Sequence, residues 1–114
     1  MVFVLSLYKV RTVDIPEFAA AFAPMGIWPR VANQLPGYVH ADLMIRSDSP
    51  RMLLLHQFWE TAEHFQVARR SEPYRNLAGL LGTIATGHLD IGVFGFRPGI
   101  TRAQIARQTD SARW

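Results

Sequence analysis

The chain has 114 residues, of which 49% are hydrophobic and 18% charged, which is too apolar for a disordered chain and typical of one folded domain. Cysteine is absent, which excludes disulfides, zinc–thiolate sites, iron–sulfur clusters and cysteine nucleophiles. Residues 97–114 hold four arginines and one aspartate, so they carry the whole net charge of +3 and residues 1–96 are neutral. Residues 1–96 therefore show no basic stripe of the kind that binds nucleic acid. No apolar run approaches the roughly 20 residues that span a bilayer. We therefore expect a cytoplasmic protein with neither a membrane nor a nucleic-acid partner.

The N-terminal third predicts a strand followed by a broken helix. Residues 2–10 are β-branched and aromatic without Gly or Pro, which is typical of a strand. Asp14 can cap the helix that follows it. Pro24 and Pro29 each remove a backbone donor, so we expect a break between them and a second helical piece that ends near Leu35.

The middle of the chain predicts a hairpin. Residues 38–46 alternate between polar and apolar, and a polar turn separates them from a second strand at 52–59. Helical segments are expected on both sides of Pro73, and residues 88–96 form the last strand. Gly92 lies inside that strand, where glycine favours a bulge or a close backbone approach.

The order βαββαβ predicts a ferredoxin-like α+β fold with a four-stranded antiparallel sheet over residues 1–96. Residues 97–114 are expected to be a basic tail that forms a short helix or is partly disordered. Two helices cover one face of such a sheet, yet the first and third strands are apolar on both faces. We expect the same sheet of a second copy to cover the other face, in a homodimer joined through Val39, Leu43, Leu54 and Phe58.

Three stretches of the sequence resemble motifs of a known protein family. They are Leu-Pro-Gly-Tyr at 35–38, Phe-Trp-Glu-Thr-Ala-Glu-His-Phe at 58–65 and Ser-Glu-Pro-Tyr-Arg-Asn-Leu at 71–77. In order and spacing, residues 1–96 resemble the antibiotic biosynthesis monooxygenase family of the dimeric α/β-barrel group. The resemblance implies a ligand between sheet and helices in each subunit. It leaves the reaction open, since relatives include cofactor-independent oxygenases, haem-degrading oxygenases, lactone isomerases and polyketide cyclases.

The resemblance also implies a set of pocket residues. Trp59 matches the family tryptophan that faces the pocket, and the two-residue period of strands extends the prediction to its neighbours. The expected substrate-binding lining is Ser6, Tyr8, Met44, Leu55 and Gln57, with Phe65 and Tyr74 from the helices above. His56 is expected on the opposite face of the sheet, toward the dimer partner.

Departures from the family pattern narrow the expected chemistry. Haem-degrading members keep a tryptophan and a histidine where this chain has Ala68 and Ala78, so we expect no haem degradation. The quinone-forming oxygenases keep asparagine, tyrosine and histidine at positions that are here Leu55, Phe65 and Met44. No histidine pair has metal-ligand spacing and no nucleotide fingerprint is present, so we expect neither a metal nor an organic cofactor.

Two His-x-Asp pairs are candidates for proton transfer. His40 and Asp42 are two apart on a strand, so both side chains point the same way, and a carboxylate that fixes the imidazole tautomer suits a general base. His88 and Asp90 repeat the arrangement on the last strand. His40 ranks first because the resemblance places it on the Met44 face. For both pairs the alternative is that they are ordinary polar residues of sheet edges without a catalytic role.

Trp59 is the third expected catalytic residue. It can stack on a planar substrate or donate its indole N–H, and it is equally explained as a buried core aromatic. The sequence thus indicates a cofactor-independent monooxygenase-like enzyme for a small aromatic, polyketide or quinol-type compound. The alternatives are a cyclase or isomerase that uses the same base, and a small-molecule-binding dimer without chemistry.

Overall fold

The computed structural model describes residues 1–95, so the expected tail at 97–114 and the domain boundary at 96 lie outside the described residues. The strands and helical segments follow one another in the order that the sequence predicts. The elements are β1 (Val2–Lys9), the short 3-10 turn η1 (Thr12–Asp14), α1 (Ile15–Ala20), α2 (Ile27–Ala32), β2 (Tyr38–Ile45), β3 (Met52–Trp59), α3 (Ala62–Arg70), α4 (Glu72–Ile84) and β4 (Gly87–Gly95).

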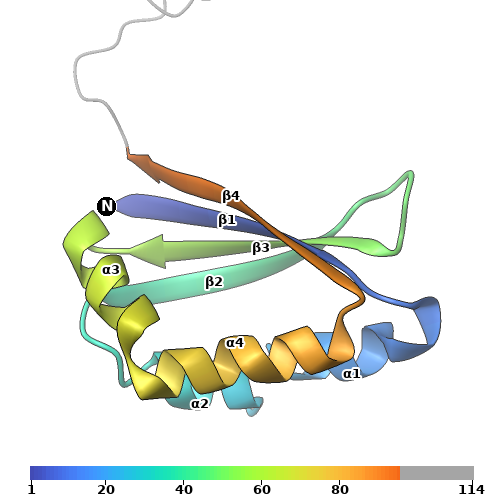
Figure 1. The fold of residues 1–114 in the computed structure, drawn as a ribbon, viewed down its shortest axis with the longest axis horizontal. Helices are drawn as coiled ribbons and strands as arrows, with labels where there is room; N and C mark the ends of the chain where they lie inside the picture. The colour runs from blue at the N-terminus through green and yellow to red at the C-terminus, as the bar shows by residue number, and fades with distance from the viewer. Residues whose placement is uncertain (96–114) are drawn as a thin grey trace, which may run out of the picture.

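The strands form one antiparallel sheet in the order β2-β3-β1-β4. All the helices of the described part lie on one face of this sheet, and the other face is open (Figure 1). The first and last strands of the chain are therefore neighbours, although they lie about 80 residues apart in sequence. This arrangement confirms the ferredoxin-like α+β fold.

The break in the first helical segment lies where the prolines predict it. α1 ends at Ala20 and α2 begins at Ile27, and the Trp28 N–H donates to the Ala21 carbonyl at 2.9 Å across the break. The expectation that Asp14 caps α1 is wrong, because its side chain accepts no hydrogen bond from the helix. Asp14 instead accepts from Arg11 Nε at 2.8 Å.

Ser71 ends α3 and begins α4. Its extended backbone stops one helix, and its Oγ then accepts a hydrogen bond from the Tyr74 N–H at 3.3 Å as the cap of the next. Pro73 stands in the first turn of α4, where a missing N–H costs nothing. This corner fixes the first turn of α4, and with it Tyr74, above the sheet.

The core lies between the sheet and the helices in two clusters of buried side chains. The larger gathers around Phe18, Leu53, Leu55 and Leu81, and the smaller consists of Val4, Trp59, Phe65 and Ala68. Tyr38 and Tyr74 pack against both, so they join the two clusters. Every odd-numbered residue of β3 from Leu53 to Trp59 is buried on this helix-covered face, as the period of two predicts.

A bulge at the start of β2 reverses the expected orientation of that strand. Tyr38 lies opposite Trp59, but His40 rather than Val39 lies opposite Phe58, so Val39 is the extra residue. Tyr38 therefore faces the helices, whereas His40 and the residues at alternate positions after it face the open side. The expected placement of His40, Asp42 and Met44 on the Trp59 face is wrong, and so is that of Leu43 on the open face.

Candidate functional site

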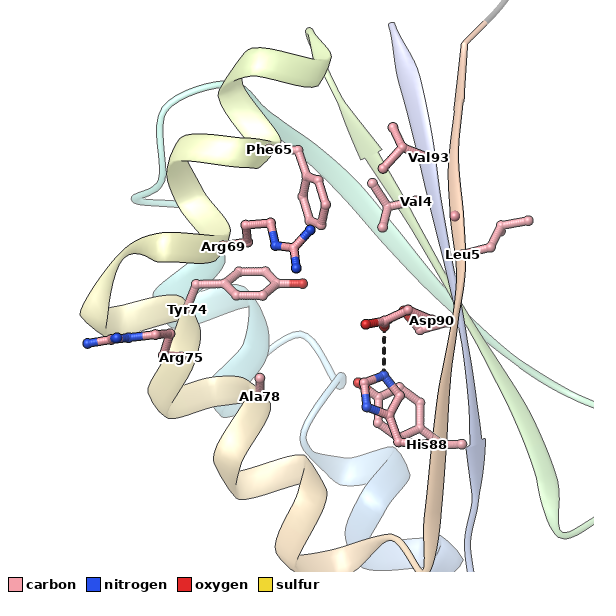
Figure 2. A pocket seen from close by; sticks show the side chains of 13 residues that line it. Val4, Leu5, Phe65, Arg69, Tyr74, Arg75, Ala78, His88, Asp90 and Val93 are labelled. Atoms are coloured by element: carbon pink, nitrogen blue, oxygen red, sulfur yellow. Dashed lines mark hydrogen bonds and ion pairs between the residues drawn. The ribbon is translucent and has the colours of Figure 1, made fainter.

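A pocket of about 250 Å³ lies between the β1–β4 edge of the sheet and helices α3 and α4 (Figure 2). Its apolar wall includes Val4 and Val93 from the strands and Phe65 from α3. Its polar groups are Ser6, Tyr8, Arg69, Tyr74, His88 and Asp90, while Arg75 borders the rim with its side chain pointing away from the cavity (Figure 2). An apolar pocket with a few converging polar groups is the usual form of a small-molecule site, and this one suits a small ligand.

A second bulge brings the polar groups of β4 into the pocket. Leu5 lies opposite Gly92 and Ser6 opposite Asp90, so Ile91 is the extra residue, and Gly92 adopts a φ of +152°. The bulge expected at Gly92 is confirmed. As a result Asp90 and His88 face the helices beside Ser6 and Tyr8, on the face that forms the floor of the pocket.

One carboxylate oxygen organises this floor. Asp90 Oδ1 accepts a hydrogen bond from Ser6 Oγ at 3.2 Å and pairs with His88 Nε2 at 2.8 Å. A carboxylate on Nε2 favours the tautomer that carries its proton there, which leaves Nδ1 as an acceptor. In Figure 2 Nδ1 lies on the side of the ring that faces α4, in the space between the sheet and that helix. His88 thus has the orientation and the free lone pair of a general base.

The tyrosines of the pocket remain neutral hydroxyls. Burial raises the pKa of Tyr8 far above its ordinary value, and the neighbouring Tyr74 and Asp90 raise it further. Burial also raises the pKa of Tyr74, against a smaller opposing effect from its hydrogen bond with Gln57. Both side chains can donate or accept a hydrogen bond at neutral pH, and neither is a base.

Trp59 and Gln57 lie behind the pocket wall. Trp59 Nε1 donates to Gln57 Oε1 at 3.0 Å, and Gln57 Nε2 donates to the Tyr74 hydroxyl at 3.1 Å. Trp59 is fully buried, with its ring 5.6 Å from that of Phe65. Its N–H is thus already committed inside the protein, and its contact with the pocket runs through Phe65 and Tyr74.

The structure brings together four of the ten residues expected at the site, namely Ser6, Tyr8, Phe65 and Tyr74. Leu55, Gln57 and Trp59 share the helix-covered face but are buried in the layer behind them. His40 and Asp42 do form an ion pair, at 2.7 Å, with side chains that are 60% and 53% exposed. They lie with Met44 on the open face, beyond the sheet from the pocket.

Sequence reasoning missed Arg69 and gave His88 and Asp90 second place. Arg69 follows Phe65 by four residues on α3, so the two side chains share one face of the helix. This spacing could have indicated that Arg69 borders the same pocket as Phe65. For His88 and Asp90 the His-x-Asp pattern was visible, but the sheet order that sets them beside Ser6 and Tyr8 was needed to choose them.

Residues 1–95 contain other hollows as well. The hollow between α2 and α4 is larger, about 480 Å³, and is lined by apolar side chains with Asn76 and Glu72, without a histidine. Within residues 1–95 no three His, Asp or Glu side chains gather as a metal ion requires. None of the helices in this range has the length and apolar character to cross a membrane.

Comparison with known proteins identifies the fold. No protein-family model and no curated protein matches the sequence. Among solved structures, a mutant of SnoaB, a cofactor-independent oxygenase from Streptomyces nogalater, has a TM-score of 0.68 at 20% identity, over 89% of this chain and 97% of that one. A proposed antibiotic biosynthesis monooxygenase from Deinococcus radiodurans has a TM-score of 0.71 at 10% identity, with the same shares covered. The chain has the fold of the antibiotic biosynthesis monooxygenases, and the resemblance is confirmed at that level.

Proposed function

We propose that the protein is a cofactor-independent monooxygenase for a small aromatic or quinol-type compound, with His88 as its general base. The observation that carries the proposal is the Asp90–His88 pair in a pocket with apolar walls. The sequence alone favoured His40 as the base, but His40 lies on the open face of the sheet. We therefore assign the base to His88, which Asp90 holds in the pocket. That SnoaB is a cofactor-independent oxygenase on the same fold supports the reaction class.

The proposed reaction needs a base and dioxygen. His88 Nδ1 takes a proton from an acidic C–H or O–H of the substrate, which leaves an electron-rich carbanion or phenolate. That anion reduces dioxygen directly. For an anthrone-type methylene, one oxygen atom enters the product as a carbonyl and the other leaves as water, and the methylene supplies the four electrons and both hydrogens: R₂CH₂ + O₂ → R₂CO + H₂O. For a hydroquinone, one oxygen atom enters the ring as a hydroxyl and the ring is oxidised to the quinone, so the substrate again supplies four electrons: C₆H₆O₂ + O₂ → C₆H₄O₃ + H₂O.

The remaining pocket groups have positioning roles in this proposal. The hydroxyls of Tyr8 and Tyr74 are uncharged donors near the base, suited to hold a developing oxyanion, whereas the Ser6 proton is already given to Asp90. Val4 and Phe65 are buried and form the apolar part of the wall, whereas the side chains of His88 and Asp90 are 42% and 71% exposed. In this proposal the bound substrate itself therefore covers the base and keeps water from the reactive anion. Trp59 keeps Tyr74 in place through Gln57 and does not itself touch the substrate.

Oxygen uptake with a panel of anthrones and hydroquinones tests the reaction class. The protein purified without added flavin or metal should consume one dioxygen per product, and isotopically labelled dioxygen should place one labelled atom in the product. Product formation without oxygen uptake would instead identify a cyclase or isomerase that uses the same base. Ligand binding without any product would leave the binding-dimer alternative.

We also propose a homodimer through the open face of the sheet. This face carries Phe3, Leu54 and Phe58 from the central strands. At the edge strand β4, Leu89 and Phe94 are 61% and 47% exposed. An apolar sheet face of this size is costly in water unless something covers it, and a second copy presents a matching surface about a two-fold axis.

Sedimentation of the full chain tests the dimer. Leu54→Asp would bury an unpaired charge, which costs about 3–5 kcal/mol, so this variant should sediment as a monomer or fail to fold. Val67→Asp is the matched control, because Val67 is 69% exposed on α3 and away from the open face. A folded wild-type monomer at micromolar concentration would overturn the dimer.

A further inference from the structure

Arg69 is a cation directed into the pocket. Figure 2 shows its guanidinium in the space between Phe65 and Tyr74, whereas the side chain of Arg75 points away from the cavity although it borders the same rim. Within residues 1–95 the ion pairs join other residues, and none includes Arg69. A guanidinium offers five N–H donors in a planar fork that matches a carboxylate.

The pocket therefore has two electrically different ends. Asp90 supplies negative charge at the floor and Arg69 supplies positive charge at the rim, with the Tyr74 side chain between them (Figure 2). The pKa of Tyr74 reflects both neighbours. Burial raises it most and the Gln57 hydrogen bond lowers it, and beyond these Asp90 raises it and Arg69 lowers it. A ligand with one anionic end thus has a single favourable orientation.

We propose that the pocket selects aromatic carboxylic acids, with the carboxylate paired to Arg69 and a ring hydroxyl or acidic C–H at His88. The aromatic ring then lies between Phe65 on one side and Val4 and Val93 on the other. Asp90 repels the carboxylate from the floor, so the acidic group is held away from the reacting end. The assignment of the reacting end rests on the proposed function, whereas the selection of an anion by Arg69 does not.

Equilibrium binding separates these two parts. The probes are 6-hydroxy-2-naphthoic acid and its methyl ester, which share rings and hydroxyl and differ in the charge at the far end. Titrated into the full-length protein and followed by tryptophan fluorescence, the acid should bind at least tenfold more tightly than the ester. Because Arg69 is at the rim, added salt should reduce the difference.

Variants assign the preference to one side chain. Arg69→Gln should bring the acid and the ester to equal affinity, and Arg69→Lys should restore part of the preference without bidentate geometry. Arg75→Gln is the matched control and should keep the full preference, because its side chain points away. Equal binding of both probes to the wild type, an unchanged preference in Arg69→Gln, or no binding of either probe would overturn the proposal. The two claims can fail separately. If the wild type prefers the acid, Arg69→Gln abolishes that preference and no oxygen is consumed with any substrate, the selection of an anion by Arg69 is upheld and the monooxygenase function is refuted.

Discussion

The imidazole of His88 lies flat on the phenol ring of Tyr8, with ring centroids 4.6 Å apart and planes 5° from parallel. The two residues are direct partners across the β1–β4 ladder, and Tyr8 in turn packs against the fully buried Phe18 with centroids 5.1 Å apart. The proposed base is therefore held by the sheet and the core rather than by a loop. Asp90 holds the Nε2 atom of His88, so both the plane and the rotation of the ring are constrained.

Alkaline unfolding tests the burial of the tyrosines. Burial is the largest cause that raises the pKa of Tyr8, Tyr38 and Tyr74, which are all the tyrosines of the chain. The folded state holds these protons more tightly than the unfolded state, so this stabilisation is complete below about pH 10 and is lost as the pH rises above it. Urea midpoints should stay level up to about pH 9.5 and fall beyond it, with phenolate absorbance appearing only on unfolding. Phenolate absorbance that titrates near pH 10 in the folded protein would contradict this.

The buried hydrogen bonds of Gln57 should contribute measurably to stability. Gln57→Leu keeps the volume but leaves the Trp59 N–H without its acceptor in a fully buried site. An unsatisfied buried donor costs about 1–3 kcal/mol, so the free energy of unfolding should fall by that amount. Gln34→Leu removes a comparable bond, to the Arg30 carbonyl, at an exposed position and should change stability by less than about 0.5 kcal/mol. Equal losses in both variants, measured by urea denaturation, would refute the buried role.

Gly37 is required by its turn. It has a φ of +83° at the third position of the Leu35–Tyr38 turn, and a Cβ there would collide with the ring of His64. Gly37→Ala should therefore lower the thermal midpoint. The free energy of unfolding should fall by at least about 1–2 kcal/mol, the cost of the left-handed backbone for a residue with a Cβ. Gly79→Ala is the opposite case, because no atom lies within 4 Å of a Cβ there and the residue is inside α4. It should stabilise by about 0.5–1 kcal/mol. A Gly37→Ala protein as stable as the wild type would contradict the turn geometry.

Patterns of hydrophobicity and proline predicted the elements and the fold, because burial on one face of a strand or helix leaves a period in the sequence. The family resemblance, extended by the two-residue period of strands, placed Leu55, Gln57 and Trp59 correctly on the helix-covered face. The same extension failed at β2, where one extra residue reverses the faces of all that follow. The bulge at Val39 lies between Tyr38 and His40, inside a strand without glycine or proline to mark it, whereas the bulge on β4 is marked by Gly92.

The site itself depends on contacts that no local pattern contains. Ser6 and Asp90 are joined by a hydrogen bond across 84 positions of sequence, and only the pairing of β1 with β4 brings them together. The two His-x-Asp pairs are equivalent as sequence. What separates them is that β4 borders the pocket on its helix-covered face, while the first pair lies on the open face of β2.

The two His-x-Asp pairs permit the most direct test of the central claim, that His88 is the base of a cofactor-independent oxygenase. His88→Ala and His40→Ala remove the same side chain from similar ion pairs on the two edge strands, at 2.8 Å and 2.7 Å from an aspartate. Their oxygen uptake rates with a substrate found in the anthrone and hydroquinone panel are compared with the wild type. We predict that His88→Ala lowers turnover by about 10²–10⁴, the usual contribution of a positioned base, while His40→Ala keeps the wild-type rate. Full turnover in His88→Ala, or the large loss in His40→Ala instead, would contradict the account.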